Sequence, residues 1–441
     1  MRHTGAVRIA LVHYTCLPTI AGVELVMGEH ARLFWENGHA VTVVAGNAPG
    51  PEDGCWESDP PLPAATPETL PISPPSTPPP VSIPLADLGT RSPLAQRAHR
   101  ELASGGIGMV FEQAVEQLAA ELRPILAAQD VVMLHNVATM HFHLALTAAL
   151  WRLADELPRV RFVCWVHDLA ACNPDYAPLP LHREPWARLA QAHPRFAYVA
   201  VSELRRRQFT ELTKQPPPRC RTIPNGVDPT RLLDISPQTS ELARRLGWLD
   251  RDLVLLHPTR LLRRKNVELT LRVVAALKAA GHSCACLITA PPEVQSGTAE
   301  IYEREIRDLH GQLDLAGDVF FLSDLSPGGP LGPRAMHEVF QLADALFFPS
   351  RQEGFGIPPL EAALHRLPIF CSDIEPLRTL LPRGVTTFTL EATPETIAAL
   401  IVRTLAADPA SAARAHTLRH FSWAAIYRNF LSPLLAETEP I

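Results

Sequence analysis

The sequence predicts an α/β protein built from two doubly wound, Rossmann-like domains that face each other across a cleft. Short apolar runs alternate with helical segments along the chain, which is the pattern of parallel α/β architecture. The alternation occurs twice, once in each half of the chain. The length of 441 residues suits two or three domains with sizeable cores.

The apolar runs are predicted as β-strands in chain order. In the first half they are Val7–His13, Ala40–Ala45, Val131–Leu134, Arg161–Val166 and Tyr198–Val201. In the second half they are Leu253–His257, Cys284–Thr289, Val319–Leu322, Ala345–Phe348 and Ile369–Cys371. The clearest helix follows Lys265, because Leu269, Val273 and Leu277 share one face and Gly281 stands at a C-terminal cap position.

A boundary is predicted at Asn225-Gly226, a strong turn pair. Residues 1–225 would form the first domain and residues 226–418 the second, while residues 419–441 would form a helix that returns to the first. Within the first domain, the stretch from about 49 to 84 is rich in proline and poor in large apolar residues. It is predicted to be an extended insertion without a core of its own.

Composition excludes several classes of function. The net charge of -6, with 46% hydrophobic and 20% charged residues, is ordinary for a globular protein and does not favour a nucleic-acid partner. No apolar run approaches the length of a membrane span. Because the N-terminus resembles a first strand rather than a signal peptide, a cytoplasmic location is expected. No pair among the eight cysteines has zinc-ligand spacing.

The strongest candidate site lies between Glu353 and Glu361. Gly354 and Gly356 would let the backbone turn sharply and approach a ligand closely. Pro358 or Pro359 suits the first turn of the following helix, whose start favours an anion. A nucleotide sugar, with hydroxyls at both ends and phosphates between them, fits this pattern. The simpler alternative is a strand–loop–helix connection with two surface glutamates.

A second candidate lies after the strand Leu253–His257. Arg260 and Lys265 stand at its carboxyl end, just before a helix, where two cations can clamp a diphosphate. They would neutralise the charge that builds on a leaving nucleoside diphosphate. The alternative is a solvated basic loop, which also describes the neighbouring Arg263 and Arg264.

The string Pro-Ser-Arg-Gln-Glu-Gly-Phe-Gly-Ile-Pro-Pro-Leu-Glu-Ala, residues 349–362, closely resembles the donor-site signature of retaining glycosyltransferases of family 4, which have the GT-B fold. The resemblance implies that Glu353 lies at the donor sugar and that Glu361 binds ribose hydroxyls. It also implies that Arg260 and Lys265 hold the diphosphate.

By the same resemblance, backbone N–H groups of Gly354, Phe355 and Gly356 would reach the sugar or the phosphates. The chain departs from the family pattern at Arg366, because a glycine is usual shortly before the next strand. That departure concerns the helix end rather than the ligand contacts.

In the first domain, Thr15–Glu24 resembles the family's glycine-rich loop and implies that the Gly22 backbone approaches the diphosphate. Ala21 replaces a usual glycine there, which weakens the match because alanine resists positive φ. His167 ends a predicted strand where many family members place a histidine beside the donor sugar and acceptor. His135-Asn136 is a second candidate for acceptor contact, although a histidine at a strand end is more often structural.

The resemblance implies an enzyme that moves a sugar from a nucleoside-diphosphate sugar to an acceptor hydroxyl, with retention of anomeric configuration and without a metal or other cofactor. The donor is a nucleotide sugar, and the acceptor is unknown. Asp250-Arg-Asp252 spells a metal-binding pattern of another fold but lies in a polar connection, so it is interpreted as surface. The alternatives are a sugar-nucleotide epimerase, a sugar phosphorylase, or a nucleotide-sugar-binding regulatory protein without turnover.

Overall fold

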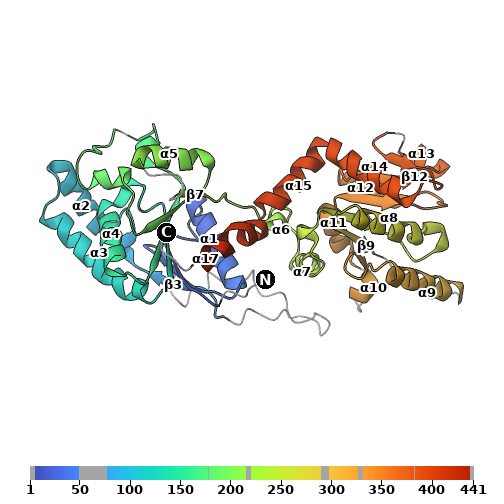
Figure 1. The fold of residues 1–441 in the computed structure, drawn as a ribbon, viewed down its shortest axis with the longest axis horizontal. Coiled ribbons are helices and arrows are strands. Elements are labelled where there is room, and N and C mark those ends of the chain that lie inside the picture. Colours follow the sequence, from blue (N-terminus) through green and yellow to red (C-terminus); the bar gives the residue numbers. More distant parts are fainter. Residues whose placement is uncertain are drawn as a thin grey trace. The chain divides into compact units, whose positions relative to one another are not determined.

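The computed structural model describes residues 5–48, 77–176, 178–214, 220–289, 297–325, 331–381 and 383–437. The chain divides into two compact units: Met1–Gly226 together with Ile426–Ile441, and Val227–Ala425. Each unit contains one parallel sheet with helices on its faces (Figure 1). The predicted fold of two doubly wound α/β domains is therefore confirmed.

Unit 1 is built on a seven-stranded sheet in the order β3-β2-β1-β4-β5-β6-β7. Its strands are β1 Arg8–Val12, β2 Ala40–Ala45, β3 Val81–Pro84, β4 Val131–His135, β5 Arg161–Val166, β6 Phe196–Ala200 and β7 Cys220–Thr222. Its helices are α1 Gly22–Glu36, α2 Pro93–Ser104, α3 Met109–Ala127, α4 Leu144–Glu156, α5 Glu203–Thr213 and, near the C-terminus, α17 Ser432–Ala436.

The unit 1 core forms where helices α2 to α4 pack on the sheet. Leu94, Leu118 and Leu150 from these helices are buried in one cluster with Val132 and Phe162 from the strands. Burying each such side chain stabilises the fold by about 1.5–3 kcal/mol. This core supports the carboxyl ends of the central strands, where the loops of interest begin.

Unit 2 is built on a six-stranded sheet in the order β10-β9-β8-β11-β12-β13. Its strands are β8 Leu253–His257, β9 Cys284–Ile288, β10 Val319–Phe321, β11 Ala345–Phe348, β12 Ile369–Ser372 and β13 Thr386–Phe388. Its longer helices are α7 Pro237–Arg245, α8 Val267–Ala279, α9 Gly297–Gln312, α11 Pro333–Leu342, α12 Ile357–Leu364, α14 Pro394–Ala407 and α15 Pro409–Phe421. The short ones are α6 Pro229–Leu232, α10 Leu322–Leu325 and α13 Glu375–Leu380, and α16 Trp423–Ile426 runs across the boundary to unit 1.

Central strands agree closely with the sequence prediction, and of the four edge strands only β10 was predicted. The bounds of β2, β5, β8 and β11 are those predicted. Three strands were missed, β3, β7 and β13, and each lies at a sheet edge. The predicted proline-rich insertion was wrong at its C-terminal end, because Val81–Pro84 pair with β2 as a parallel edge strand. Its residues 49–76 lie outside the described residues.

The chain passes between the units twice, at Gly226–Val227 and at Ala425–Ile426. Both passages adjoin one short contact in unit 2. Val227 donates its N–H to the Phe421 carbonyl at 2.7 Å and accepts the Trp423 N–H at 3.0 Å. The second passage occurs later in the chain than the predicted position 419.

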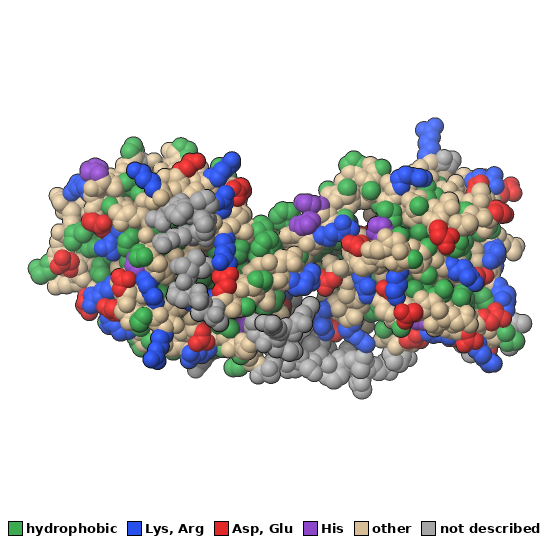
Figure 2. All heavy atoms as spheres, in the orientation of Figure 1, with side chains coloured by type: hydrophobic (Ala, Val, Ile, Leu, Met, Phe, Trp, Pro, Cys, Tyr) green, Lys and Arg blue, Asp and Glu red, His purple; other side chains and the backbone are tan. Residues whose placement is uncertain are grey.

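In the space-filling view, acidic and basic side chains are interspersed over the visible face of each unit (Figure 2). In the described part of the chain, no single helix is long and apolar enough to cross a membrane. Helices α14 and α15 meet the same length and composition test only as a pair, bent by 89°.

Candidate functional site

The carboxyl ends of β8 and β11 mark the topological switch point of unit 2. The two strands are parallel neighbours, with Leu255 opposite Ala345. From β8 the sheet continues to β9 on one side, and from β11 it continues to β12 on the other. Ligands of doubly wound folds bind where the strand order diverges in this way. The loops that carry both predicted parts of the donor site therefore leave the sheet side by side.

An ion pair joins these two loops. The Lys265 ammonium nitrogen lies 2.5 Å from Oε1 of Glu353. The side chains are only 13% and 6% exposed, so water screens the pair weakly. The Lys265 ammonium also lies 5.0 Å from the centre of the Phe348 ring, at the end of β11. A second cation, Arg264, approaches Oε2 of Glu353 at 3.4 Å.

Three further contacts hold the loops together, and the sequence analysis did not foresee them. Asn266 is buried in the left-handed conformation, with φ of 57°, and donates its amide to the Pro349 carbonyl at 3.1 Å. The Arg351 N–H bonds the Arg264 carbonyl at 2.7 Å, and the Arg351 guanidinium bonds the Asn266 side-chain oxygen at 2.9 Å. Asparagine tolerates the left-handed region of backbone conformation. The asparagine directly after Lys265 was therefore the sequence signal for a turn at this position.

Arg260 differs from Lys265 in having no side-chain partner among the described residues. It is exposed at the carboxyl end of β8, and its guanidinium makes no ion pair or hydrogen bond with any described residue. Its neighbour Arg263 pairs with Glu305 at 2.8 Å, outside the two loops. Among the described residues, Arg260 is therefore without a side-chain partner, whereas Arg263 belongs to an ordinary surface ion pair.

Backbone N–H groups form the third part of the site. Those of Gly354, Phe355, Gly356 and Ile357 donate to no other described residue. Gly356 precedes α12 with φ of 103°, and a Cβ there would lie 2.8 Å from Cδ2 of Leu377.

Gly354, by contrast, has no positive φ, and a Cβ added there would meet no described atom within 4 Å. The backbone conformation therefore requires glycine at position 356 but not at position 354, and the close approach of a ligand to Gly354 stays a prediction. Pro358 lies in the first turn of α12, as predicted. Because Pro358 and Pro359 lack N–H groups, the anion-binding donors of this helix start lie before them.

Glu361 lies on α12, eight residues beyond Glu353 in the sequence. Glu361 is exposed, and its carboxylate forms no hydrogen bond or ion pair with a described side chain. Glu353 and Glu361 therefore differ in environment: one carboxylate is buried in an ion pair, and the other is open to solvent.

Unit 1 has its own switch point, between β1 and β4. Gly22 begins α1 in an open position, and Ala21 before it is extended, with φ of −145°. Alanine is therefore unstrained where the family usually has glycine, because no positive φ is required. His167 directly follows β5 at the same edge of the sheet, and its ring is only partly exposed.

His135 does not take the role predicted for it. It is fully buried at the end of β4, so it cannot contact an acceptor directly. Its Nδ1 lies 3.0 Å from Nε2 of His167. The side-chain oxygen of Asn136 accepts the N–H groups of His167 and Asp168, each at 2.9 Å. Both residues therefore support the His167 loop from within the fold.

Comparison with known families agrees with this two-unit architecture. The family model described as "Glycosyltransferase Family 4" matches residues 20–231, and the model described as "Glycosyl transferases group 1" matches residues 238–417. Together they cover most of both units. The chain belongs to glycosyltransferase family 4.

Two curated relatives carry the name D-inositol 3-phosphate glycosyltransferase. The protein from Stackebrandtia nassauensis is 30% identical over 185 residues, which are 40% of this chain and 38% of the relative. The protein from Nocardia farcinica is 27% identical over 281 residues, 62% of this chain and 57% of the relative. The aligned regions thus span roughly two fifths to three fifths of these relatives' length. A solved structure, Anabaena HepE with UDP and glucose, is 15% identical at a TM-score of 0.33, covering 98% of this chain and 100% of that one.

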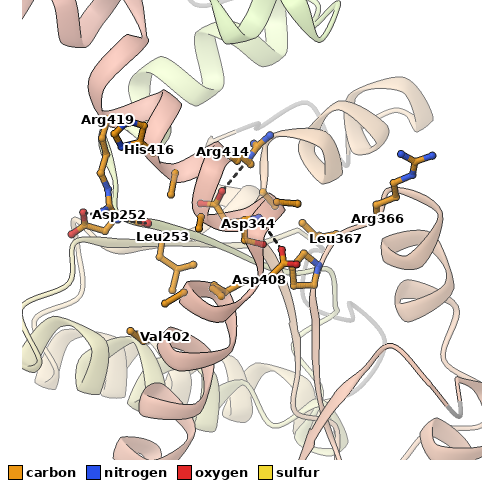
Figure 3. A pocket seen from close by; sticks show the side chains of 18 of the residues that line it. Asp252, Leu253, Asp344, Arg366, Leu367, Val402, Asp408, Arg414, His416 and Arg419 are labelled. Carbon is orange, nitrogen blue, oxygen red and sulfur yellow. Dashed lines mark hydrogen bonds and ion pairs between the residues drawn. The ribbon is translucent and has the colours of Figure 1, made fainter.

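In this family 4 member, unit 2 also contains a cavity of about 520 Å³ (Figure 3). Its lining residues at the strand starts place it at the opposite edge of the sheet from Lys265 and Glu353. It is lined by Leu253, which begins β8, and by Asp344, which precedes β11. Arg414 of α15 forms an ion pair with Asp344 at 3.1 Å. Asp252 pairs with Arg419 at 3.2 Å and thus belongs to this polar edge, in agreement with its interpretation as surface.

Proposed function

We propose that this protein transfers a sugar from a nucleoside-diphosphate sugar to an acceptor hydroxyl, with retention of anomeric configuration and without a metal ion. One observation carries the proposal: cations and unsatisfied backbone N–H groups meet a buried carboxylate at the switch point of unit 2. Family membership supports the same reaction class.

Each group has a role that follows from its chemistry. Arg260 and Lys265 bind the diphosphate and stabilise the negative charge that develops on it as the sugar leaves. The N–H groups of Gly354 and Gly356 donate to phosphate or sugar oxygens. Glu353 orients the donor sugar, and exposed Glu361 accepts hydrogen bonds from ribose hydroxyls.

A metal ion is unnecessary in this scheme, because positively charged side chains neutralise the leaving diphosphate. Two cations and several N–H donors supply the electrostatic stabilisation that a divalent ion would otherwise give. The remaining task of the protein is to hold donor and acceptor in a reactive geometry.

The test is release of nucleoside diphosphate from a panel of nucleotide sugars, measured with and without acceptors and in the presence of EDTA. The acceptor panel includes simple sugars, polyols and D-inositol 3-phosphate, the last because two relatives are named for it. Release that requires an acceptor and survives EDTA supports the proposal. Interconversion of nucleotide sugars without an acceptor would identify an epimerase, and loss of release in EDTA would reject the metal-free mechanism.

A further inference from the structure

We propose that His135 and Asn136 are positioning residues that hold His167 in one neutral tautomer, with its proton on Nδ1. In that form His167 offers a sugar oxygen a hydrogen-bond donor and cannot act as a base. The inference rests on the proposed function for its substrate class, a sugar hydroxyl. His135 and Asn136 themselves do not touch substrate; they act through His167.

The first step is the contact between the two rings. His135 Nδ1 and His167 Nε2 lie 3.0 Å apart, so one nitrogen carries the proton and the other accepts it. The rings are inclined by 30°, with centres 5.3 Å apart. If His135 supplies the proton of this hydrogen bond, Nε2 of His167 is the acceptor. The proton of neutral His167 must then be on Nδ1.

The surroundings of the other His135 nitrogen decide the question. Nε2 of His135 is buried and has no hydrogen-bond partner among the described residues. The Trp165 ring stacks on His135 at 6.0 Å and 24°, so it covers a face of the imidazole and offers no acceptor in the ring plane. A buried N–H without a partner is costly, and orphaned buried donors are rarer than under-satisfied acceptors. The His135 proton therefore belongs on Nδ1, which donates to Nε2 of His167.

Backbone clamping keeps the accepting nitrogen in place. Asn136 adopts φ of 61° and accepts the N–H groups of His167 and Asp168 with one oxygen. Its own N–H donates to the Trp165 carbonyl at 2.9 Å, which ties it to β5. Asparagine tolerates this left-handed conformation, and the three hydrogen bonds hold Asn136 in it.

Charge considerations keep His167 neutral. Its pKa is lowered to about 3, mainly by burial, with smaller contributions from the nearby His30 of α1 and His13 after β1. Burial also lowers the pKa of His135 well below its usual value. The Glu24 carboxylate is close to this cluster, because it lies 3.8 Å from Nε2 of His13. His167 thus remains uncharged over the physiological pH range.

The experiment is long-range ¹H–¹⁵N NMR on the full-length protein labelled with ¹⁵N-histidine, recorded without donor or acceptor at pH 6 to 8. The expected result is a protonated Nδ1 and an unprotonated Nε2 for His167. In His135→Phe the donor is lost, so His167 should populate the Nε2–H tautomer. His135→Asn, whose amide can still donate near the Nδ1 position, should keep the wild-type tautomer.

Controls separate positioning from folding. Asn136→Gly preserves the left-handed backbone but removes the side-chain oxygen, so hydrogen exchange at the His167 and Asp168 N–H groups should quicken at least tenfold. His193→Phe, a buried histidine elsewhere in unit 1, should leave the His167 signals unchanged.

Two results would overturn the inference. One is a wild-type His167 protonated on Nε2, and the other is an unchanged tautomer in a folded His135→Phe protein. If His135→Phe does not fold, the wild-type tautomer and the Asn136→Gly exchange rates still decide. Because no readout needs turnover, a failure of the proposed function would leave this test intact.

Discussion

Lys265 and Glu353 form an ion pair across the switch point of unit 2, with Nζ 2.5 Å from Oε1. The two residues come from different loops and are 88 positions apart in the sequence. A diphosphate that binds the Lys265 ammonium must compete with the Glu353 carboxylate. Donor binding is therefore expected to shift Glu353 from the cation toward the sugar hydroxyls.

This competition predicts that Glu353→Gln binds nucleoside diphosphate more tightly than wild type, by about threefold to tenfold, or about 0.7–1.4 kcal/mol. Sugar transfer should nevertheless fall, because the contact to the donor sugar is weakened. Isothermal titration calorimetry measures the first effect and product formation the second. Glu361→Gln is the matched comparison and should weaken binding, since a ribose contact is shared by ground and transition states. Equal weakening in both variants would contradict the competition.

The two cations should separate by their effect on stability. Arg260→Ala should reduce transfer about 10²–10³-fold without changing the melting temperature, because its exposed guanidinium bonds no described residue. Lys265→Ala should lose transfer and also about 1–3 kcal/mol of stability, because it leaves the buried Glu353 with Arg264 alone.

Arg263→Ala serves as the control for the basic loop. Its side chain pairs with Glu305 on the surface, so both rate and stability should stay near wild type. A wild-type transfer rate in Arg260→Ala would remove that residue from the diphosphate site.

Substitution by alanine should affect stability differently at two glycines that stand two positions apart. Gly356→Ala should lower stability by about 1–3 kcal/mol, because φ is 103° and the new Cβ would lie 2.8 Å from Leu377. Gly354→Ala should leave stability unchanged, because its surroundings are open. A loss of donor affinity in a fully stable Gly354→Ala protein would then report a ligand that approaches the backbone. Urea unfolding and nucleotide titration measure the two effects.

Stability should fall as pH is lowered below about 6.5. Burial lowers the pKa values of His30, His167 and His257 to about 3, whereas the unfolded chain titrates near 6.5. Between these values the unfolded state binds more protons, so acid favours unfolding. Each histidine contributes up to about 1.4 kcal/mol per pH unit.

Urea unfolding at pH 7, 6 and 5 tests this expectation. His257→Asn can keep the hydrogen bond to Thr270. It should lower the pH dependence of the free energy of unfolding of unit 2 by the amount that corresponds to about one proton taken up on unfolding. A free energy of unfolding that is constant from pH 7 to pH 5 would show that these histidines are not buried as neutral groups.

Sequence patterns predicted the central strands well because buried parallel strands are continuous apolar runs. Leu253–His257 and Ala345–Phe348 are buried throughout. Two of the missed edge strands lack that signal: β7 has the sequence Cys-Arg-Thr and β13 has Thr-Thr-Phe. Short polar strands of this kind take their pairing from the neighbouring strand, which no local pattern reveals.

Individual site residues were also within reach of the sequence, but their partners were not. Arg260, Lys265 and the segment Glu353–Glu361 follow strands whose carboxyl ends a parallel sheet must align. The pairing of Lys265 with Glu353 depends on β8 and β11 being neighbours, which is a property of strand order. For the same reason, the burial of His135 beneath His167 could not be read from a strand end alone.

The central claim is sugar transfer with retention, and one measurement tests it most directly. A ¹H NMR time course of the protein with its nucleotide sugar and acceptor, in EDTA, follows the anomeric signal of donor and product together. The account predicts a new glycosidic signal with the anomeric configuration of the donor, formed as nucleoside diphosphate appears. A product of inverted configuration, or a donor altered only at another carbon without any acceptor, would contradict it.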